Sequence, residues 1–302
     1  MEIYVSKCFL IVVLLFSFST IGFAYQEKDS ELNSKLNSKL NSKILSTKIT
    51  YKDNHLNSKP YPLYVSVFGG GGSLFTRNIE QTGLAFNEGS NQKVPVDVSG
   101  GNSRNSVGFG GVHVGYKWND LLKSADGSKW GFTPATELEG YYLGGIQRDN
   151  LNNNKLNTGD YNYKVTYPLH NGVFLANAVL NINPLDKLKF HPYVGAGVGA
   201  ALVATTGAES IQTAPVKSSL NYYSTKSSSS DWAFATQAKL GLSLDVTSSS
   251  SIFAEYRFLY LAPSQYNLGS TKNQSNIASS SWDIHMGGLY SNMGTLGVRY
   301  DL

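Results

Sequence analysis

Cysteine is almost absent from this chain of 302 residues, and the single one, Cys8, lies in an N-terminal apolar segment. Removal of that segment would leave no thiol, which excludes disulfides, cysteine-ligated metals and a cysteine nucleophile. Charged residues make up only 15% of the sequence, below the ~25% that is usual for soluble domains. Apolar runs after Ala24 are short, so no later segment is predicted to cross a membrane as a helix of about 20 residues.

The sequence also lacks the motifs of common catalytic and binding sites. Its histidines show no metal-ligand spacing, and no Gly-x-Ser-x-Gly elbow precedes a helix. The run Gly69–Gly72 is followed by no helix and no Lys-Ser/Thr pair, so close strand packing is preferred over a phosphate loop. No basic stripe with interleaved aromatics is present after residue 60, which argues against nucleic acid binding. We therefore expect no cofactor, no metal and no enzymatic activity.

The first 24 residues have the pattern of a secretory signal peptide. Lys7 provides a charged start, Phe9–Phe18 is almost entirely apolar, and Gly22-Phe23-Ala24 fits the small-x-small cleavage rule. The prediction is export with cleavage after Ala24. An uncleaved anchor is the alternative, but the apolar run is short for a membrane span.

Residues 25–59 form a second region of low complexity. The tetrapeptide Leu-Asn-Ser-Lys begins at Leu32, Leu36 and Leu40 and again at Leu56, and seven lysines against four acidic residues give this region a net charge of +3. Asn and Ser disfavour helix interiors. The composition predicts a disordered periplasmic arm, and the alternative is a basic arm that touches peptidoglycan, lipid head groups or a partner.

From residue 60 to residue 302 the sequence alternates between apolar and polar residues, which is typical of strands. At the C-terminus, for example, Leu296, Val298 and Tyr300 would share one face, with Gly297 and Arg299 on the other. Eight strands are predicted, at residues 61–74, 106–118, 130–145, 170–183, 191–205, 232–247, 251–262 and 293–302.

The predicted connections alternate in length. Three are short (119–129, 183–190 and 248–250), and four are long and polar (75–105, 146–169, 206–231 and 263–292). An eight-stranded barrel with both termini in the periplasm needs three short turns and four long outer loops. Because lipid cannot satisfy an open sheet edge, a membrane sheet must close on itself. The predicted fold is therefore an all-β, antiparallel, up-and-down transmembrane barrel in the outer membrane of a Gram-negative bacterium.

Three segments carry a resemblance to a known family: His191–Ala200, Phe253–Phe258 and Gly297–Tyr300. The chain resembles the small eight-stranded outer-membrane barrels that include opacity-type surface antigens, and it is similar to the OmpA-type transmembrane domain, over most of residues 60–302. The resemblance implies a C-terminal strand that is read by the barrel assembly machinery. The chain departs from the family by ending in Leu302 instead of phenylalanine, and by the repeats in residues 25–59, which have no counterpart there.

Alternation directs the apolar faces to lipid and the mixed faces to the lumen. Aromatic residues that include Tyr141 and Tyr142 are candidates for the two interface girdles. Charges in a lumen of this size must pair, so we predict a structural ion network rather than an ion pathway. The predicted lumen charges are Lys117, Glu137, Glu139, Lys239, Asp245, Glu255, Arg257, Arg299 and Asp301.

Three functions remain open from the sequence. The favoured one is a structural or adhesive surface antigen whose loops meet a host or environmental ligand. The alternative is a narrow channel or a carrier of small solutes. An envelope enzyme that uses Asp283 and His285 is less favoured, because polar loop positions account for these residues better.

Overall fold

The computed structural model describes residues 62–86, 93–101, 103–118, 122–123, 130–153, 162–184, 189–214, 220–223, 226–273, 276–277 and 279–302. The chain divides into two units, Met1–Leu56 and Asn57–Leu302, and all described residues belong to the second. The predicted signal peptide (1–24) and arm (25–59) lie outside the described residues, so both assignments stay predictions.

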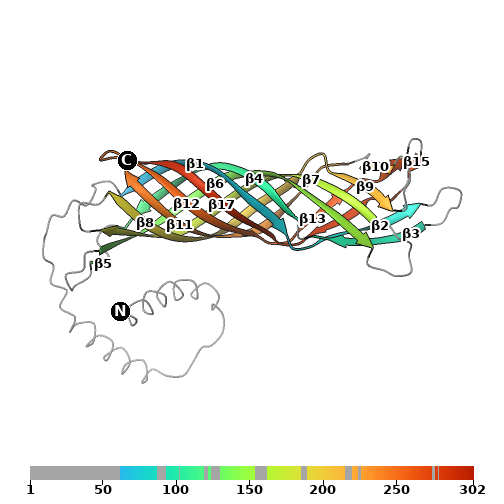
Figure 1. Cartoon of the computed structure of the whole chain (residues 1–302), viewed down its shortest axis with the longest axis horizontal. Coiled ribbons are helices and arrows are strands. Elements are labelled where there is room, and N and C mark those ends of the chain that lie inside the picture. Colours follow the sequence, from blue (N-terminus) through green and yellow to red (C-terminus); the bar gives the residue numbers. More distant parts are fainter. Residues whose placement is uncertain are drawn as a thin grey trace, which may run out of the picture. The chain divides into compact units, whose positions relative to one another are not determined.

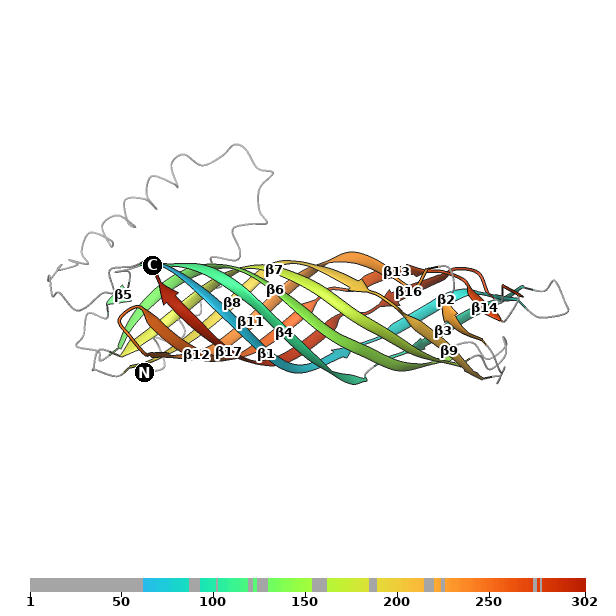
Figure 2. The same cartoon turned by 90° about the horizontal axis from the view of Figure 1, so that it is seen from above.

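Eight strands form a closed antiparallel ring (Figures 1 and 2). In order around the ring they are β1, β4, β6, β7, β8, β11, β12 and β17, and β17 pairs back onto β1. Their bounds are β1 Leu63–Thr76, β4 Arg104–Lys117, β6 Trp130–Asn153, β7 Asn162–Pro184, β8 Phe190–Thr205, β11 Ser229–Asp245, β12 Ser250–Leu261 and β17 Leu289–Asp301. A short strand, β5 (Leu122–Lys123), pairs with the start of β6.

The register fixes the geometry of the ring. Paired residues followed once around the ring from Leu63 return to β1 at Ser73, which is ten residues further along. A shear of ten residues over eight strands tilts the strands by about 40° from the barrel axis. A barrel of this size has an interior that side chains fill, so the inward residues decide whether anything can pass.

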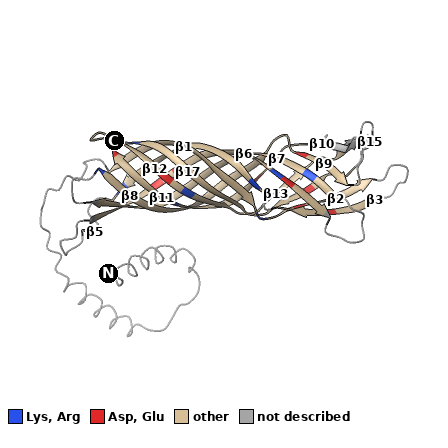
Figure 3. Cartoon of the chain, in the orientation of Figure 1, with Lys and Arg blue, Asp and Glu red and all other residues tan. Residues whose placement is uncertain are grey.

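The outer wall of the ring is apolar, as the alternation predicts. Leu138 and Leu296 are each 71% exposed, and Val67, Phe174 and Leu240 are also largely exposed. In lipid such side chains are in their preferred environment. Charged residues occupy few positions along the strands of the ring (Figure 3). The described residues contain no helix that is long and apolar enough to span a membrane.

The aromatic girdle prediction was wrong at one position. Tyr142 is 51% exposed on the outer wall, but Tyr141 is only 4% exposed and points inward. Adjacent residues of a strand must face opposite sides, so only one of the two can lie in a girdle. Outward aromatic pairs occur toward both ends of the ring, where Tyr116 contacts Trp118 and Phe75 stacks on Tyr290.

Beyond the ring, at the end opposite the C-terminus, the long connections form further β-structure, which we call the upper tier (Figures 1 and 2). It consists of the far ends of β6 and β7 together with β2 Ile79–Phe86, β3 Lys93–Gly100, β9 Glu209–Ala214, β10 Leu220–Tyr223, β13 Ser264–Leu268, β14 Thr271–Asn273, β15 Asn276–Ile277 and β16 Trp282–Met286. Most of these strands pair in the order β13–β16–β2–β3–β6–β7–β9, and β10, β14 and β15 form a small separate sheet.

The upper tier has an apolar interior of its own. Val98, Leu151 and Ile284 are fully buried, and the ring of Tyr163 meets Trp282 edge-on at 5.7 Å between centroids. The expectation of four polar loops without strands was therefore wrong. The alternation there spans only a few residues per segment, as in Trp282–Met286, and the pairing partners are far apart in sequence. The eight predicted ring strands are all present, and β6 and β7 extend well beyond their predicted bounds into this tier.

Candidate functional site

The lumen of the ring holds a cluster of buried charges near its middle. Every residue of this cluster lies on the inward face of its strand, because it alternates with an outward apolar residue. The structure brings together six of the sequence-predicted residues, which we call the lumen cluster: Glu137 and Glu139 on β6, Lys239 on β11, Glu255 and Arg257 on β12, and Arg299 on β17.

Glu139 and Arg257 form the centre of this cluster. The Arg257 guanidinium is fully buried and ion-pairs with both Glu139 and Glu255. Glu139 also lies 3.3 Å from the Lys239 ammonium, which in turn pairs with Glu137. The cations thus each contact a carboxylate, as burial of charge requires.

Neutral side chains complete the hydrogen bonding of the carboxylates. The Tyr64 hydroxyl donates to Glu137 at 2.6 Å, and the Tyr193 hydroxyl donates to Glu255 at 3.0 Å. The amides of Asn177 and Gln237 donate to Glu139 at 3.3 and 3.2 Å. Sequence reasoning placed these residues on inward faces without assigning them a role, since inward alternation does not reveal which strand lies across the lumen.

Aromatic rings enclose the two arginines of the cluster. The Arg257 guanidinium carbon lies 4.1 Å from the centroid of the Phe68 ring and 5.7 Å from that of Tyr141. The Arg299 guanidinium carbon lies 4.5 Å from the Tyr64 ring. Such cation–π contacts strengthen where water is excluded. The rings therefore add to the ion pairs in closing the lumen.

The remaining predicted lumen charges lie apart from this cluster. Lys117 pairs with Asp301 at 2.7 Å near the short-turn end, where the Lys117 side chain is partly exposed. Asp245 pairs with His191 at 3.1 Å, and about a quarter of each side chain is exposed. Both pairs lie at the short-turn end of the ring, since the strands that carry them begin or end there.

One group in the cluster has the composition of a metal site. Ligand atoms of His113, Glu137 and Glu139 all lie within 4.8 Å of one another, and all three residues are buried. However, three carboxylates in the cluster face three cations, Lys239, Arg257 and Arg299. A divalent ion would add two positive charges to a buried set that is already balanced. The donor set therefore does not fit a metal.

The candidate catalytic pair lies in the upper tier. Asp283 and His285 both project from the exposed side of β16, and the register sets them opposite Thr82 and Glu80 of β2. The Asp283 carboxylate accepts a hydrogen bond from the Asn267 amide at 2.9 Å. The two residues thus share a face but lie on an open surface, without the enclosed pocket that excludes water in most active sites.

Comparisons with known proteins give one family match and several similar solved structures. Residues 156–301, just under half of the chain, match the surface antigen family. The part of the chain that matches includes β7, β8, β11, β12 and β17 of the eight-stranded antiparallel ring. No curated protein sequence matches it.

Among solved structures, the barrel overlaps with Neisserial surface protein A at 14% identity and a TM-score of 0.34, covering 80% of this chain and 97% of the other. It overlaps with the outer membrane protein OprG of Pseudomonas aeruginosa at 15% identity and a TM-score of 0.36, covering 80% and 98%. The outer membrane protease OmpT of Escherichia coli overlaps at 11% identity and a TM-score of 0.27, covering 80% and 97%.

Proposed function

We propose that this chain is a surface antigen in which the ring serves as a membrane anchor and the upper tier presents loops to the environment, in a structural or adhesive role. The observation that carries the proposal is the contrast between the two interiors. The lumen of the ring is filled by ion pairs and aromatic rings, and the upper tier has an apolar core. A filled anchor beneath a packed outer body suits display better than transport.

Hydrogen bonds between segments of the upper tier support its role as a rigid platform. The Gln81 amide on β2 donates to the Ser210 hydroxyl on β9 at 3.3 Å, across the interior of the tier. Backbone hydrogen bonds join further segments: the Ala208 N–H donates to the Ser227 carbonyl, and the Gly269 N–H donates to the Lys226 carbonyl. Loops held by such a body are ordered at their bases, which lowers the entropic cost of binding a ligand.

The channel or carrier function is less well supported. A pathway along the axis would have to cross Glu139, which pairs with both Arg257 and Lys239 in the centre of the lumen. Opening it would separate buried charges from their partners, which is costly. The enzyme function has the support of one exposed Asp–His pair only, so we propose that the protein is not an enzyme.

The same proposal includes the route to the membrane. Cleavage after residue 24 releases the exported chain, residues 25–59 remain as a periplasmic arm, and the assembly machinery reads the C-terminal strand. The partners are then outer-membrane lipid, this machinery and a surface ligand. Mass spectrometry of the N-terminus of the protein from isolated envelopes tests the cleavage directly.

Loop replacement tests the display function. Residues 87–92, which connect β2 to β3, and residues 215–219, which connect β9 to β10, are replaced by Gly-Ser linkers of equal length. The matched control replaces residues 185–188, between β7 and β8 at the opposite end. We expect the outer replacements to reduce attachment of cells to host or abiotic surfaces, and the control to leave it unchanged. Equal attachment in all variants, with normal barrel assembly, would contradict the adhesive role.

A further inference from the structure

One part of the outer wall is rich in glycine. Six glycines face outward there on four neighbouring strands, and we call them the glycine floor: Gly69 and Gly71 on β1, Gly108 and Gly110 on β4, Gly144 on β6 and Gly294 on β17. Four of them stand side by side in one row, because the register pairs Gly294 with Gly71, Gly71 with Gly108 and Gly108 with Gly144.

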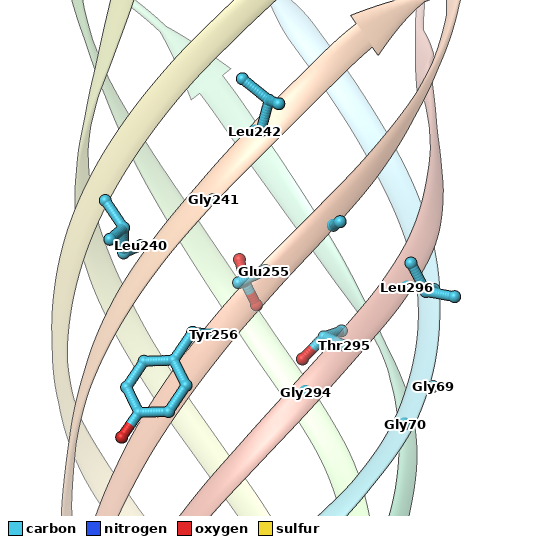
Figure 4. Close-up of a pocket in the computed structure, with 11 residues that line it drawn as sticks. Gly69, Gly70, Leu240, Gly241, Leu242, Glu255, Tyr256, Gly294, Thr295 and Leu296 are labelled. Atoms are coloured by element: carbon cyan, nitrogen blue, oxygen red, sulfur yellow. The ribbon is translucent and has the colours of Figure 1, made fainter.

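The glycine floor continues into a groove on the outer wall. The groove encloses about 670 Å³, and its lining includes Gly69, Gly294 and the side chains of Leu240, Tyr256 and Leu296. In Figure 4, Leu240 and Tyr256 project from β11 and β12. A Cβ atom at Gly294 would meet nothing within 4 Å. The space beside Gly294 is therefore open to a ligand from the membrane.

Three exposed arginines lie above the floor on the same strands, toward the upper tier. We call them the basic rim: Arg77 directly follows β1, Arg104 begins β4, and Arg148 lies on the far half of β6. Arg104 pairs with Phe75 of β1, and the Arg148 backbone N–H donates to Asn105 beside it. Arg148 therefore lies beside the residue that follows Arg104 in β4.

This arrangement of like charges is unfavourable for the protein by itself. Like charges that lie close together on neighbouring strands repel one another. Among the residues that the structure describes, no carboxylate forms an ion pair with any of the three arginines. Asp149, next to Arg148 in sequence, is buried on the opposite face of β6, and Glu80 accepts from the Asn78 amide at 2.7 Å. An anion bound between the arginines would relieve the repulsion.

This inference rests on the proposed function, in which the upper tier lies outside the membrane and both features then lie in the outer leaflet. The floor belongs to the half of the apolar wall that is nearer the upper tier, and the rim lies where the outward residues become polar. Arginine is suited to phosphate because its guanidinium donates two parallel hydrogen bonds. The floor offers close approach to a flexible apolar chain, since glycine leaves the backbone bare.

We propose that the glycine floor and the basic rim together bind one phosphorylated, acylated lipid of the outer leaflet, of the lipopolysaccharide type. An acyl chain lies along the groove at Gly294, and the phosphate sits between Arg104 and Arg148. This site is independent of any ligand of the loops. The site would fix the rotational position of each barrel relative to one lipid molecule.

Binding of purified lipid A to the barrel in phosphatidylcholine vesicles tests the proposed contact between the lipid phosphate and the basic rim. The variant Arg104→Gln/Arg148→Gln is compared with Lys189→Gln/Lys226→Gln, in which two exposed charges far from the site are removed. We expect the rim variant to bind lipid A roughly tenfold more weakly or worse, and the control to bind like the parent. Equal affinity for dephosphorylated lipid A, or complete competition by inorganic phosphate, would overturn the proposal.

Substitution of floor glycines by leucine tests the proposed position of the acyl chain. Gly108→Leu/Gly294→Leu places side chains where a Cβ has room, and the control Ala176→Leu/Ala238→Leu adds the same bulk at exposed outward positions of β7 and β11. Heat-modifiable migration on a gel establishes that each variant is folded. Loss of lipid A binding in the glycine variant alone supports the proposal. Unchanged binding in a folded glycine variant would contradict the acyl position.

Discussion

The substitution Arg257→Met probes the stability of the lumen cluster most directly. Methionine keeps much of the volume beside Phe68 but removes the guanidinium that Glu139 and Glu255 share. Removal of one partner of a buried ion pair costs about 3–5 kcal/mol, because the other charge stays buried and unpaired. Glu139 keeps Lys239 at 3.3 Å, so we expect a loss of about 3 kcal/mol, at the lower end of that range.

The assay is urea unfolding of the barrel in phosphatidylcholine vesicles, followed by gel migration without boiling. The double variant Arg257→Met/Glu255→Gln removes a carboxylate together with its cation and should recover about 1–2 kcal/mol of the loss. Lys164→Met, on the exposed face of β7, should change the free energy of unfolding by less than about 0.5 kcal/mol. A loss below about 1 kcal/mol for Arg257→Met would refute the reasoning, since a buried charge would then have been left unpaired at little cost.

Further predictions concern the wall, the packing and the upper tier. Leu138→Arg on the lipid-facing wall, where Leu138 is 71% exposed, should cost about 2–4 kcal/mol near the bilayer midplane in the same assay. Gly241→Ala should lower the folded fraction on heat-modifiable gels, because its Cβ would lie 2.2 Å from the Tyr193 ring; Gly294→Ala should leave that fraction unchanged. In the upper tier, burial raises the pKa of Tyr266 above its ordinary value of 10.0. The folded state then favours the neutral phenol. The contribution of Tyr266 to the free energy of unfolding is therefore complete below pH 10.0 and is lost as the pH rises further. Ultraviolet titration of the phenolate is compared between the parent and Tyr266→Phe. The difference should correspond to one tyrosine that ionises only on unfolding. Ionisation of Tyr266 in the folded protein at its ordinary pKa would contradict this.

The ring could be predicted from the sequence because alternation is a local property. Val112 and Val114 lie on the outer wall and His113 lies inside, as period two requires. The lengths of the connections supplied the strand count, and the need to close a membrane sheet supplied the topology. No comparison of distant segments was needed for these steps.

The upper tier and the contacts of the lumen depend on long-range pairing, which alternation does not reveal. Ile284 on β16 pairs with Gln81 on β2, and each segment alone is too short to stand out as a strand. In the lumen, the sequence indicated that Glu139 faces inward. The register around the whole ring, with its shift of ten residues, decides that Arg257 and Gln237 meet it.

Cysteine labelling of intact cells tests the central claim, a closed barrel with its upper tier outside the membrane. Cys8 is the only cysteine, so single cysteines are introduced in a Cys8→Ser background at the exposed positions Asp283, Lys189 and Leu138. A membrane-impermeant maleimide should label Asp283→Cys on intact cells, label Lys189→Cys only after the outer membrane is broken, and label Leu138→Cys only after solubilisation and unfolding. Labelling of Lys189→Cys, but not Asp283→Cys, on intact cells would contradict the orientation, and labelling of Leu138→Cys on intact cells would contradict the membrane-embedded barrel.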